Sequence, residues 1–470
     1  MGRIGVTLSG IERSLLNQLA EANAAATLSA LRMATGSKIN HAGDDPSAFV
    51  RLSELQNRLS SVQATMDNVT AAGSMVTQTQ SAVDGIRTQL NTIRTELLKD
   101  ESGGLTAAER AEAQANIDAA IAQINTLATT EIDGRRLLDG SANFRISGRN
   151  FSQVADVRVY STGGRTLTID GSVTAAATQA ELTYNGQGGS KIDGDATFTL
   201  TGSSGAVEFT VVNNEALSTV ATRINNESHK TGVTVAVSGN DLIFSSVEYG
   251  TTAEVTIDVS AGTFIVAAGN STTDTGTDVE AAINGASYTG EGNRVTVSEI
   301  GVHYVVEFAP TFTGDLNAIT VSGDALSFTL TSDLNRRATL AIPGLQAERL
   351  GGLSGRLDEL ASGGGLDGLD ANTSQAIRVV DEALAELTLI EGAVDGFYDA
   401  SISSASGLLS DLEEDLEDAV DEINLVDTTE ETQLQTYYQN LASNSIAGLA
   451  VIRQQRSGIV TLIQQIAGLI

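Results

Sequence analysis

An unbroken seven-residue repeat of apolar side chains is the feature that most constrains this chain. Every member of the repeat is Leu or Val, and the members are Leu55, Val62, Val69, Val76, Val83, Leu90 and Leu97. A strict heptad repeat places its members on one seam of an α-helix. Because no Pro occurs between residues 47 and 309, we predict a helix of roughly 55 residues, about 80 Å long. A rod of that length needs a partner along its seam.

The second row of this seam is incomplete. We expect it to lapse at Gly73 and Gln80 and then to resume one heptad position earlier. Its apolar members are Leu52, Leu59, Met66, Ile86 and Ile93. These residues fill the other position of the coiled-coil seam.

The chain before this rod also has helical spacing. Apolar residues three or four positions apart predict one stripe on a first helix, and they are Ile4, Leu8, Ile11, Leu15 and Leu19. The turn-like segment 36–40 follows, and Asp44, Asp45 and Pro46 then open the rod. Pro is tolerated in a first helical turn, and carboxylates are favourable at the positive end of the helix dipole. After the rod, Thr106 and Glu109 have the spacing of a capping box and predict a third helix.

Helical periodicity returns near the other end of the chain, from about residue 371. Within it, residues 411–422 contain eight acidic side chains and no basic one, and Leu412 and Leu416 mark the apolar seam beside this acidic face. After Arg456 no side chain is charged, although Ile459, Leu462 and Ile466 continue the apolar pattern. An uncharged apolar end on an acidic protein is expected to be buried by a partner.

The middle of the chain has a different pattern. From about residue 155 to 345, short alternating segments rich in Thr and Val are bounded by Gly, Asn and Ser, which predicts β-strands and turns. The expected fold class is therefore α+β, with long helical coiled-coil arms at both ends and an inserted β-rich domain. We expect the two arms to pair with each other and then with further copies of the chain.

Composition excludes several function classes. The chain has 59 acidic and 27 basic side chains, a net charge of −32, and no Lys/Arg-rich run. Clustered Lys and Arg are needed to bind phosphates, so we expect neither a nucleic acid nor an anionic membrane as a partner. The N-terminus does not have the pattern of a cleavable signal peptide, and no apolar run is long enough to span a bilayer. Export from the cell would need another route.

The sequence also lacks the residue patterns of common catalytic and metal sites. Cys is absent, and the three His residues, His41, His229 and His303, are far apart without a His-Glu-x-x-His motif. Asp193-Gly-Asp195 suggests a calcium loop, but its ligand series does not continue, so a hairpin turn is the better interpretation. We therefore expect no enzymatic activity, no cofactor and no metal.

Three segments carry a resemblance to bacterial flagellin, the subunit of the flagellar filament. Residues 31–47, LRMATGSKINHAGDDPS, resemble the turn between the first two helices of that family, and residues 132–141, IDGRRLLDGS, resemble its hairpin after the third helix. In the middle, a helix over 216–226 and strands near 231–236 and 241–246 are similar to a small β-α-β repeat of flagellar outer domains. We expect Val220 and Ile224 of that helix to pack on Val233, Val235 and Ile243.

The resemblance implies a domain arrangement. Residues 1–42 with 430–470 would form the inner helices of a filament core. Residues 43–165 with 345–429 would form its outer helical domain, which includes the hairpin. Residues 166–344 would form a surface-exposed β-rich domain, with the insertion-type repeat at about 196–258. The apolar positions given above for the arms would then be the assembly interface.

The resemblance also implies a function and partners. The chain would be a structural, self-assembling subunit of a filament used for motility, secreted to the extracellular face by the flagellar export apparatus with a cytoplasmic chaperone. Its partners would be further copies of itself in a helical homopolymer, the hook-associated proteins and the filament cap. A hook-filament junction protein is the alternative, because the tail after Ala450 lacks the Pro of the usual family ending.

Overall fold

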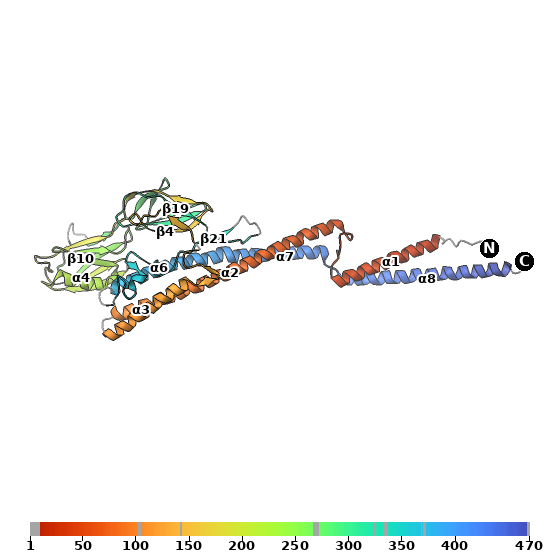
Figure 1. Cartoon of the computed structure of the whole chain (residues 1–470), viewed down its shortest axis with the longest axis horizontal. Coiled ribbons are helices and arrows are strands. Elements are labelled where there is room, and N and C mark those ends of the chain that lie inside the picture. Colours follow the sequence, from red (N-terminus) through yellow and green to blue (C-terminus); the bar gives the residue numbers. More distant parts are fainter. Residues whose placement is uncertain are drawn as a thin grey trace. The chain divides into compact units, whose positions relative to one another are not determined.

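The computed structural model describes residues 10–101, 105–141, 143–266, 272–323, 325–331, 337–367, 369 and 373–467. It divides into two compact units, Met1–Asp67 with Ser406–Ile470 and Asn68–Ala405. Long helices occupy both ends of the sequence, and β-strands occupy the middle (Figure 1). The predicted α+β class, with helical arms and an inserted β-rich region, is confirmed.

The first unit is built from helices of both chain ends. It contains α1 (Gly10–Thr35), the beginning of α2 (Pro46–Glu101), most of α7 (Ser404–Asn424) and α8 (Thr428–Ala467). Helix α2 has 56 residues, as the heptad repeat predicts. α1 and α8 run antiparallel along each other, since Arg32 bonds Glu431 near the end of α1 and Glu12 bonds Arg456 near its beginning (Figure 1).

Gly73 and Gln80 are only half-buried in α2, and the buried second row of the seam lies one position before them. Its buried members are spaced seven apart and lie three positions after the members of the first row: Thr65, Ala72, Thr79, Ile86 and Ile93. The Oγ1 atoms of Thr65 and Thr79 donate to the carbonyl oxygens of Ser61 and Met75 at 2.8 and 2.9 Å. Because the hydroxyls are satisfied within the helix, Thr can occupy a buried seam position. The row does lie one heptad position earlier at Ile86 and Ile93, as predicted, and Thr and Ala already occupy that earlier position before them.

The second unit begins with a helical bundle. It holds the rest of α2 together with α3 (Ala107–Ala128), α6 (Thr373–Phe397) and the π-helical segment Tyr398–Ser403. Thr106 and Glu109 form the predicted capping box at the start of α3. Arg110 of α3 bonds Asp100 at 3.0 Å, and Asp381 of α6 bonds Arg94 at 2.6 Å, so both helices pack on α2.

A short hairpin follows α3. Strands β1 (Glu131–Ile132) and β2 (Arg135–Arg136) are joined by Asp133 and Gly134, whose φ angles are 50° and 72°. Two successive positive φ angles match the twist of a two-residue hairpin, and Gly adopts them without a steric penalty. The turn expected at this dipeptide is confirmed.

The β-rich region follows α3 in the sequence (Figure 1). Its described residues contain two hydrophobic cores and only antiparallel strand pairs. The first core lies among three sheets. One sheet has the strand order β3 (Arg145–Ser147), β19 (Ile319–Ser322), β5 (Leu167–Ile169), and the next has the order β16 (Arg294–Glu299), β17 (Val302–Phe308), β4 (Val154–Thr162). The last has the order β15 (Ala286–Thr289), β14 (Glu280–Ile283), β6 (Gly171–Ala175), β18 (Gly314–Asp315). β3 and β4 lie before residue 166 but pair with strands after residue 300, so the pairing begins ahead of the expected domain boundary, which stays a prediction.

The second core lies within residues 180–266. Its sheets have the orders β10 (Val233–Ser238), β11 (Asp241–Ser246), β7 (Glu181–Asn185) and β13 (Thr273–Thr275), β12 (Glu254–Gly262), β8 (Ala196–Gly202), β9 (Gly205–Val211). The short helices are α4 (Leu217–Asn226) and α5 (Ser228–Thr231). Two further ribbons, β20 (Leu326–Phe328) with β21 (Ala338–Leu340) and β22 (Gly351–Gly352) with β23 (Gly355–Arg356), and the 3₁₀ helix Leu357–Leu360 lead back to α6.

The predicted β-α-β repeat is present, with one error of register. Val220 and Ile224 of α4 are fully buried in the same core as Val233 and Val235. Ile243, however, is only half-buried, and its neighbours Leu242 and Phe244 fill the core instead. Successive side chains of a strand point to opposite faces, so one position of misplacement moves a side chain out of the core.

Candidate assembly interface

Helices α1 and α8 approach each other through small side chains. The buried small residues at this contact are Ala22 and Ser29 on α1 and Ala442 and Ser445 on α8. A Cβ at Gly448 would lie 3.4 Å from Cδ1 of Leu15, so the two helices are already in contact there. Small residues let helix backbones come close and gain dispersion contacts along the pair. The arms are thus joined within one chain.

Ion pairs fix the register of this helix pair near both of its described ends. Arg456 Nη1 lies 3.1 Å from Oε1 of Glu12, and Arg32 Nη1 lies 3.0 Å from Oε1 of Glu431. Hydrogen bonds from Ser29 and Arg32 lower the pKa of Glu431, although burial acts in the opposite direction. Each acid is buried against a partly exposed arginine, so sliding one helix along the other would separate buried carboxylates from their cations.

The turn after α1 is bound to the end of α7. The backbone N–H of Lys38 donates to the carbonyl oxygen of Asn424 at 2.7 Å, and the N–H of Ile39 donates to Oδ1 of the same residue at 2.8 Å. Ser37 and Leu425 also form a β-bridge. These bonds join the N-terminal and C-terminal arms at a second point, in addition to the contact between α1 and α8.

The acidic pair before Pro46 has two separate roles. Asp45 Oδ1 accepts from the N–H groups of Ser47 and Ala48 at 3.0 and 2.9 Å, which caps the start of α2. Asp44 Oδ2 accepts from the N–H groups of Asn40 and His41, and the bond from Asn40 lowers the pKa of Asp44 most. The expected placement of both carboxylates at this helix N-terminus is confirmed.

Ion pairs also join α2 to α6 in the second unit. Arg87 bonds both carboxylate oxygens of Glu391, and Gln80 donates to Asp395 at 2.7 Å. The hydrogen bond to Glu391 raises the pKa of Arg87. These polar contacts lie beside the apolar seam, whose predicted members Val62, Val69, Val76, Val83 and Leu90 are all buried within the chain.

The other predicted interface residues lie in different environments. Leu15, Leu19 and Leu55 are half-buried, and Leu416 is buried. The exposed ones are Ile11, Leu412, Ile459 and Leu462. Ile4 and Leu8 lie outside the described residues, and Ile466 is placed in α8 without a described side chain. The structure therefore divides the predicted set into seam residues that pack inside one chain and residues that remain open.

Three of the open residues, Ile11, Ile459 and Leu462, are among several exposed apolar side chains of α1 and α8. Exposed large apolar side chains of α1 and α8 are Ile11, Leu16, Leu31, Ile446, Val451, Ile459, Val460, Leu462 and Ile463. Ile459 and Leu462 are each 58% exposed on the charge-free end of α8. Single exposed apolar residues are common, but a run of them on paired helices indicates a surface for another protein.

One contact in the bundle could not be predicted from the sequence. A Cβ at Gly73 of α2 would lie 3.2 Å from Cγ2 of Ile402, which is buried on the π-helical segment. The π-helix widens the backbone locally and brings Ile402 against the glycine. Gly73 was the only sequence signal of this close contact, because it interrupts the apolar pattern of α2. The sequence of residues 398–403 does not predict a π-helix.

Two kinds of site are not found among the described residues. None of the described helices combines the length and apolar character needed to cross a bilayer. In the same part of the chain, no group of three or more acidic or His side chains is arranged to hold a metal ion.

Comparison with known proteins identifies the N-terminal arm. Residues 9–143 match the model of the bacterial flagellin N-terminal helical region, which covers α1, α2, α3 and the β1–β2 hairpin. No curated protein matches the sequence.

Solved flagellar proteins align only weakly. Domains D1–D2–D3 of the flagellar cap protein FliD from Escherichia coli align with 45% of this chain at 16% identity and a TM-score of 0.30, and the chain spans 64% of that structure. FlgL of Xanthomonas campestris aligns over 79% of this chain and 99% of its own at 10% identity and a TM-score of 0.28. FliD (HAP2) of Pseudomonas aeruginosa PAO1 aligns over 36% and 85% at 18% identity and a TM-score of 0.26. TM-scores this low support no functional argument.

Proposed function

We propose that this chain is a structural subunit that polymerises into the bacterial flagellar filament, because its residues 9–143 match the bacterial flagellin N-terminal helical region. Its role is mechanical and not enzymatic, and its principal partner is a second copy of itself. The exposed apolar surface of α1 and α8 is the observation that supports this proposal.

Intrachain pairing makes this surface available for polymerisation. The inner faces of α1 and α8 are already occupied by each other, through Glu12–Arg456 and Arg32–Glu431. The outer faces retain large apolar side chains, which gain roughly 25 cal/mol for each Å² removed from water. A further copy presents the same surface, so repeated association would produce a polymer.

Charge sets the conditions for this association. Each copy carries a net charge of −32, and the outer part of α7 contributes eight acids in residues 411–422. Like charges on neighbouring copies repel over about 10 Å at 0.1 M salt, and higher salt screens them. Polymerisation is therefore expected to accelerate as salt is raised.

Export and terminal contacts complete the proposal. The chain would leave the cell through the flagellar export apparatus, escorted by a cytoplasmic chaperone, and would act outside it in motility. Hook-associated proteins and the filament cap would contact the ends of the polymer. The alternative, a hook-filament junction protein, is favoured by the tail after Ala450, which lacks the family's Pro.

A seeded polymerisation experiment tests the proposal. Purified full-length chain is mixed with short sheared seeds of its own polymer and followed by light scattering and electron microscopy. Long uniform filaments are expected. The variant Ile459→Gln/Leu462→Gln removes two exposed apolar side chains but retains Arg456, so the arms stay paired while elongation slows strongly.

Thr461→Gln is the matched control, because Thr461 is exposed between the two substituted positions. It should elongate like the parent chain. Short assemblies that bind one end of a filament and never lengthen would favour the junction alternative. Normal elongation by the double variant would contradict the assignment of this surface.

A further inference from the structure

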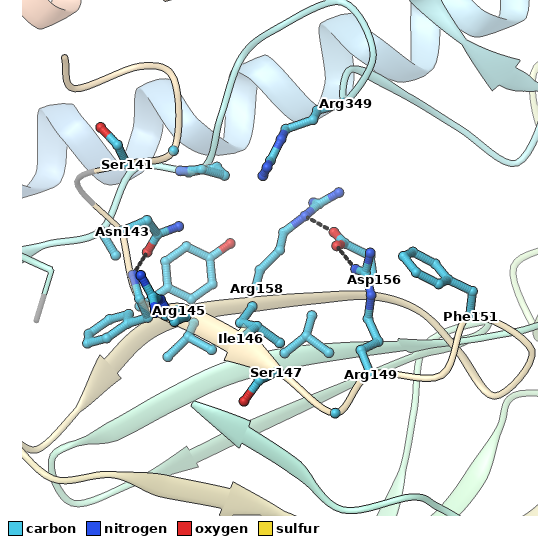
Figure 2. Close-up of a pocket in the computed structure, with 18 residues that line it drawn as sticks. Ser141, Asn143, Arg145, Ile146, Ser147, Arg149, Phe151, Asp156, Arg158 and Arg349 are labelled. Atoms are coloured by element: carbon cyan, nitrogen blue, oxygen red, sulfur yellow. Dashed lines mark hydrogen bonds and ion pairs between the residues drawn. The ribbon is translucent and has the colours of Figure 1, made fainter. Parts of the chain in front are cut away.

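Four arginines gather around one cavity in the second unit of this acidic chain. The cavity has a volume of about 620 Å³ and lies between strands β3 and β4 and the segment 341–350. Arg145 is on β3, Arg149 follows β3, Arg158 is on β4, and Arg349 enters from the segment before β22 (Figure 2). Asp156 is the one carboxylate among the described lining residues. The lining is therefore positive although the whole chain is strongly negative.

Ion pairs within the chain do not account for all of this charge. Asp156 pairs with both Arg149 and Arg158, at 3.2 and 3.0 Å. Arg158 is also 3.1 Å from Glu386, a buried carboxylate beside the cavity. The guanidinium groups of Arg145 and Arg349 have no ion pair among the described residues. Two positive groups therefore remain to attract an anion.

The geometry of the paired arginines is fixed. Because Asp156 bridges Arg149 and Arg158, their guanidinium groups are held in place before a ligand arrives (Figure 2). Figure 2 shows Arg349 directed from the opposite side toward Arg158. Arginine binds carboxylates through two parallel N–H bonds.

The remaining lining suits a compact polar ligand. Phe151 is 70% exposed at the cavity, and the guanidinium carbon of Arg149 lies 4.2 Å from its ring centroid. Asn143 also lines the cavity, and its Oδ1 accepts from the N–H of Phe144 at 2.7 Å. The hydroxyls of Ser141 and Ser147 also line the cavity. An exposed ring can pack on the C–H face of a sugar, while amides and hydroxyls bond sugar hydroxyls.

We propose that this cavity binds a carboxylated saccharide. The ligand's carboxylate bonds Arg349 and Arg145, and its sugar ring packs against Phe151. The volume is in the range of small-molecule sites, which favours a compact sugar over the face of an acidic helix. The same chemistry is present in uronic acids of polysaccharides and in sialic acids of animal glycans.

Calorimetric titration of the full-length monomeric chain tests this site with two acidic probes. Trigalacturonate represents uronic acids and sialyllactose represents sialic acids, with maltotriose and lactose as neutral counterparts. At least one acidic probe should bind, and it should bind at least about tenfold more tightly than its neutral counterpart, the effect of one charge-assisted contact. The acidic probe that binds more tightly identifies the source. If neither acidic probe binds, the proposal is wrong.

Variants locate the binding. Arg145→Gln and Arg349→Gln should each weaken binding about tenfold, and more when combined. Both arginines are exposed, so neither substitution should prevent folding. Arg165→Gln, at an exposed position in the β4–β5 turn, should bind like the parent chain. Equal affinity of the double variant and Arg165→Gln would overturn the proposal, as would preferential binding of a peptide with the sequence of residues 411–422.

Discussion

Glu12 and Arg456 join the two ends of the chain through a buried carboxylate. Arg456 Nη1 lies 3.1 and 3.3 Å from the two oxygens of Glu12, whose side chain is only 5% exposed, while the arginine is 40% exposed. The two residues are separated by 444 positions. This contact lies near the point where the described part of α1 begins, so it holds the two arms together close to their ends.

Arg456→Gln is expected to weaken the pairing of α1 with α8. Loss of the cation leaves a buried carboxylate poorly compensated, and we expect a cost of about 1–3 kcal/mol, less than for a fully buried pair because Arg456 is partly exposed. Urea unfolding followed by circular dichroism, with limited proteolysis of the arms, measures the effect. Arg453→Gln, at an exposed position on α8, is the control and should change stability little.

Val76→Asp and Val83→Asp are expected to destabilise the isolated chain. Both valines are 1% exposed in the seam of α2. An unpaired carboxylate in such a seam costs several kcal/mol, on the order of 3–5. Chemical denaturation of the monomer measures this loss, with Thr77→Asp as a control on the exposed side of α2. If the valines were buried only between subunits, the monomer would keep its stability and the intrachain packing would be wrong.

The helical arms could be predicted from the sequence because their signals are local. The heptad from Leu55 to Leu97 and the Thr106–Glu109 box are each read within one helix. Ile86 and Ile93 of the second seam row were predicted, but Thr65 and Thr79 were not, because they are polar in a pattern of residue types. Their burial depends on bonds to the carbonyls four residues earlier, which only the folded helix shows.

The basic cavity could not be predicted from spacing. Arg145, Arg149 and Arg158 are close in sequence, but Arg349 is about two hundred positions away and reaches them only through the return of the chain after β21. The chain carries 27 basic residues, and their order alone does not show which ones have a carboxylate beside them. The pairing of Asp156 with two arginines determines which remain free.

Glu386→Gln is expected to make stability less dependent on pH. Burial raises the pKa of Glu386 above 4.5, although Arg158 opposes this shift. Because the pKa of Glu386 is higher in the folded state, its contribution to folding stability is fully present below the unfolded pKa of 4.5. That contribution is lost as pH rises through the folded pKa. The variant should therefore gain stability over the parent at about pH 8 and lose that gain at about pH 4. Urea unfolding at both pH values measures the difference.

Glu348→Gln is the control for this pH experiment, because Glu348 is exposed near the same arginines. Its stability should follow that of the parent chain at both pH values. A Glu386→Gln variant that is less stable than the parent at high pH would show that the ion pair with Arg158 outweighs the cost of burial.

Gly73→Ala is expected to gain less stability than Gly392→Ala, although both glycines lie inside helices. Ala is favoured over Gly in a helix interior by about 1 kcal/mol. A Cβ at Gly392 meets no atom within 4 Å, so this variant should gain most of that amount. A Cβ at Gly73 meets Cγ2 of Ile402 at 3.2 Å, so the Ile402 side chain must move by a few tenths of an ångström and the gain should be cancelled or reversed.

Thermal and urea unfolding of both variants measure these changes. Ile402→Ala removes the opposing methyl group, so the double variant Gly73→Ala/Ile402→Ala should be more stable than Ile402→Ala alone. Ile402→Ala by itself is expected to destabilise the chain by about 2–5 kcal/mol, because it leaves a cavity in the core. The double variant must therefore be compared with Ile402→Ala and not with the parent chain. A Gly73→Ala variant as stable as Gly392→Ala would show that α2 and residues 398–403 do not pack against each other at this position.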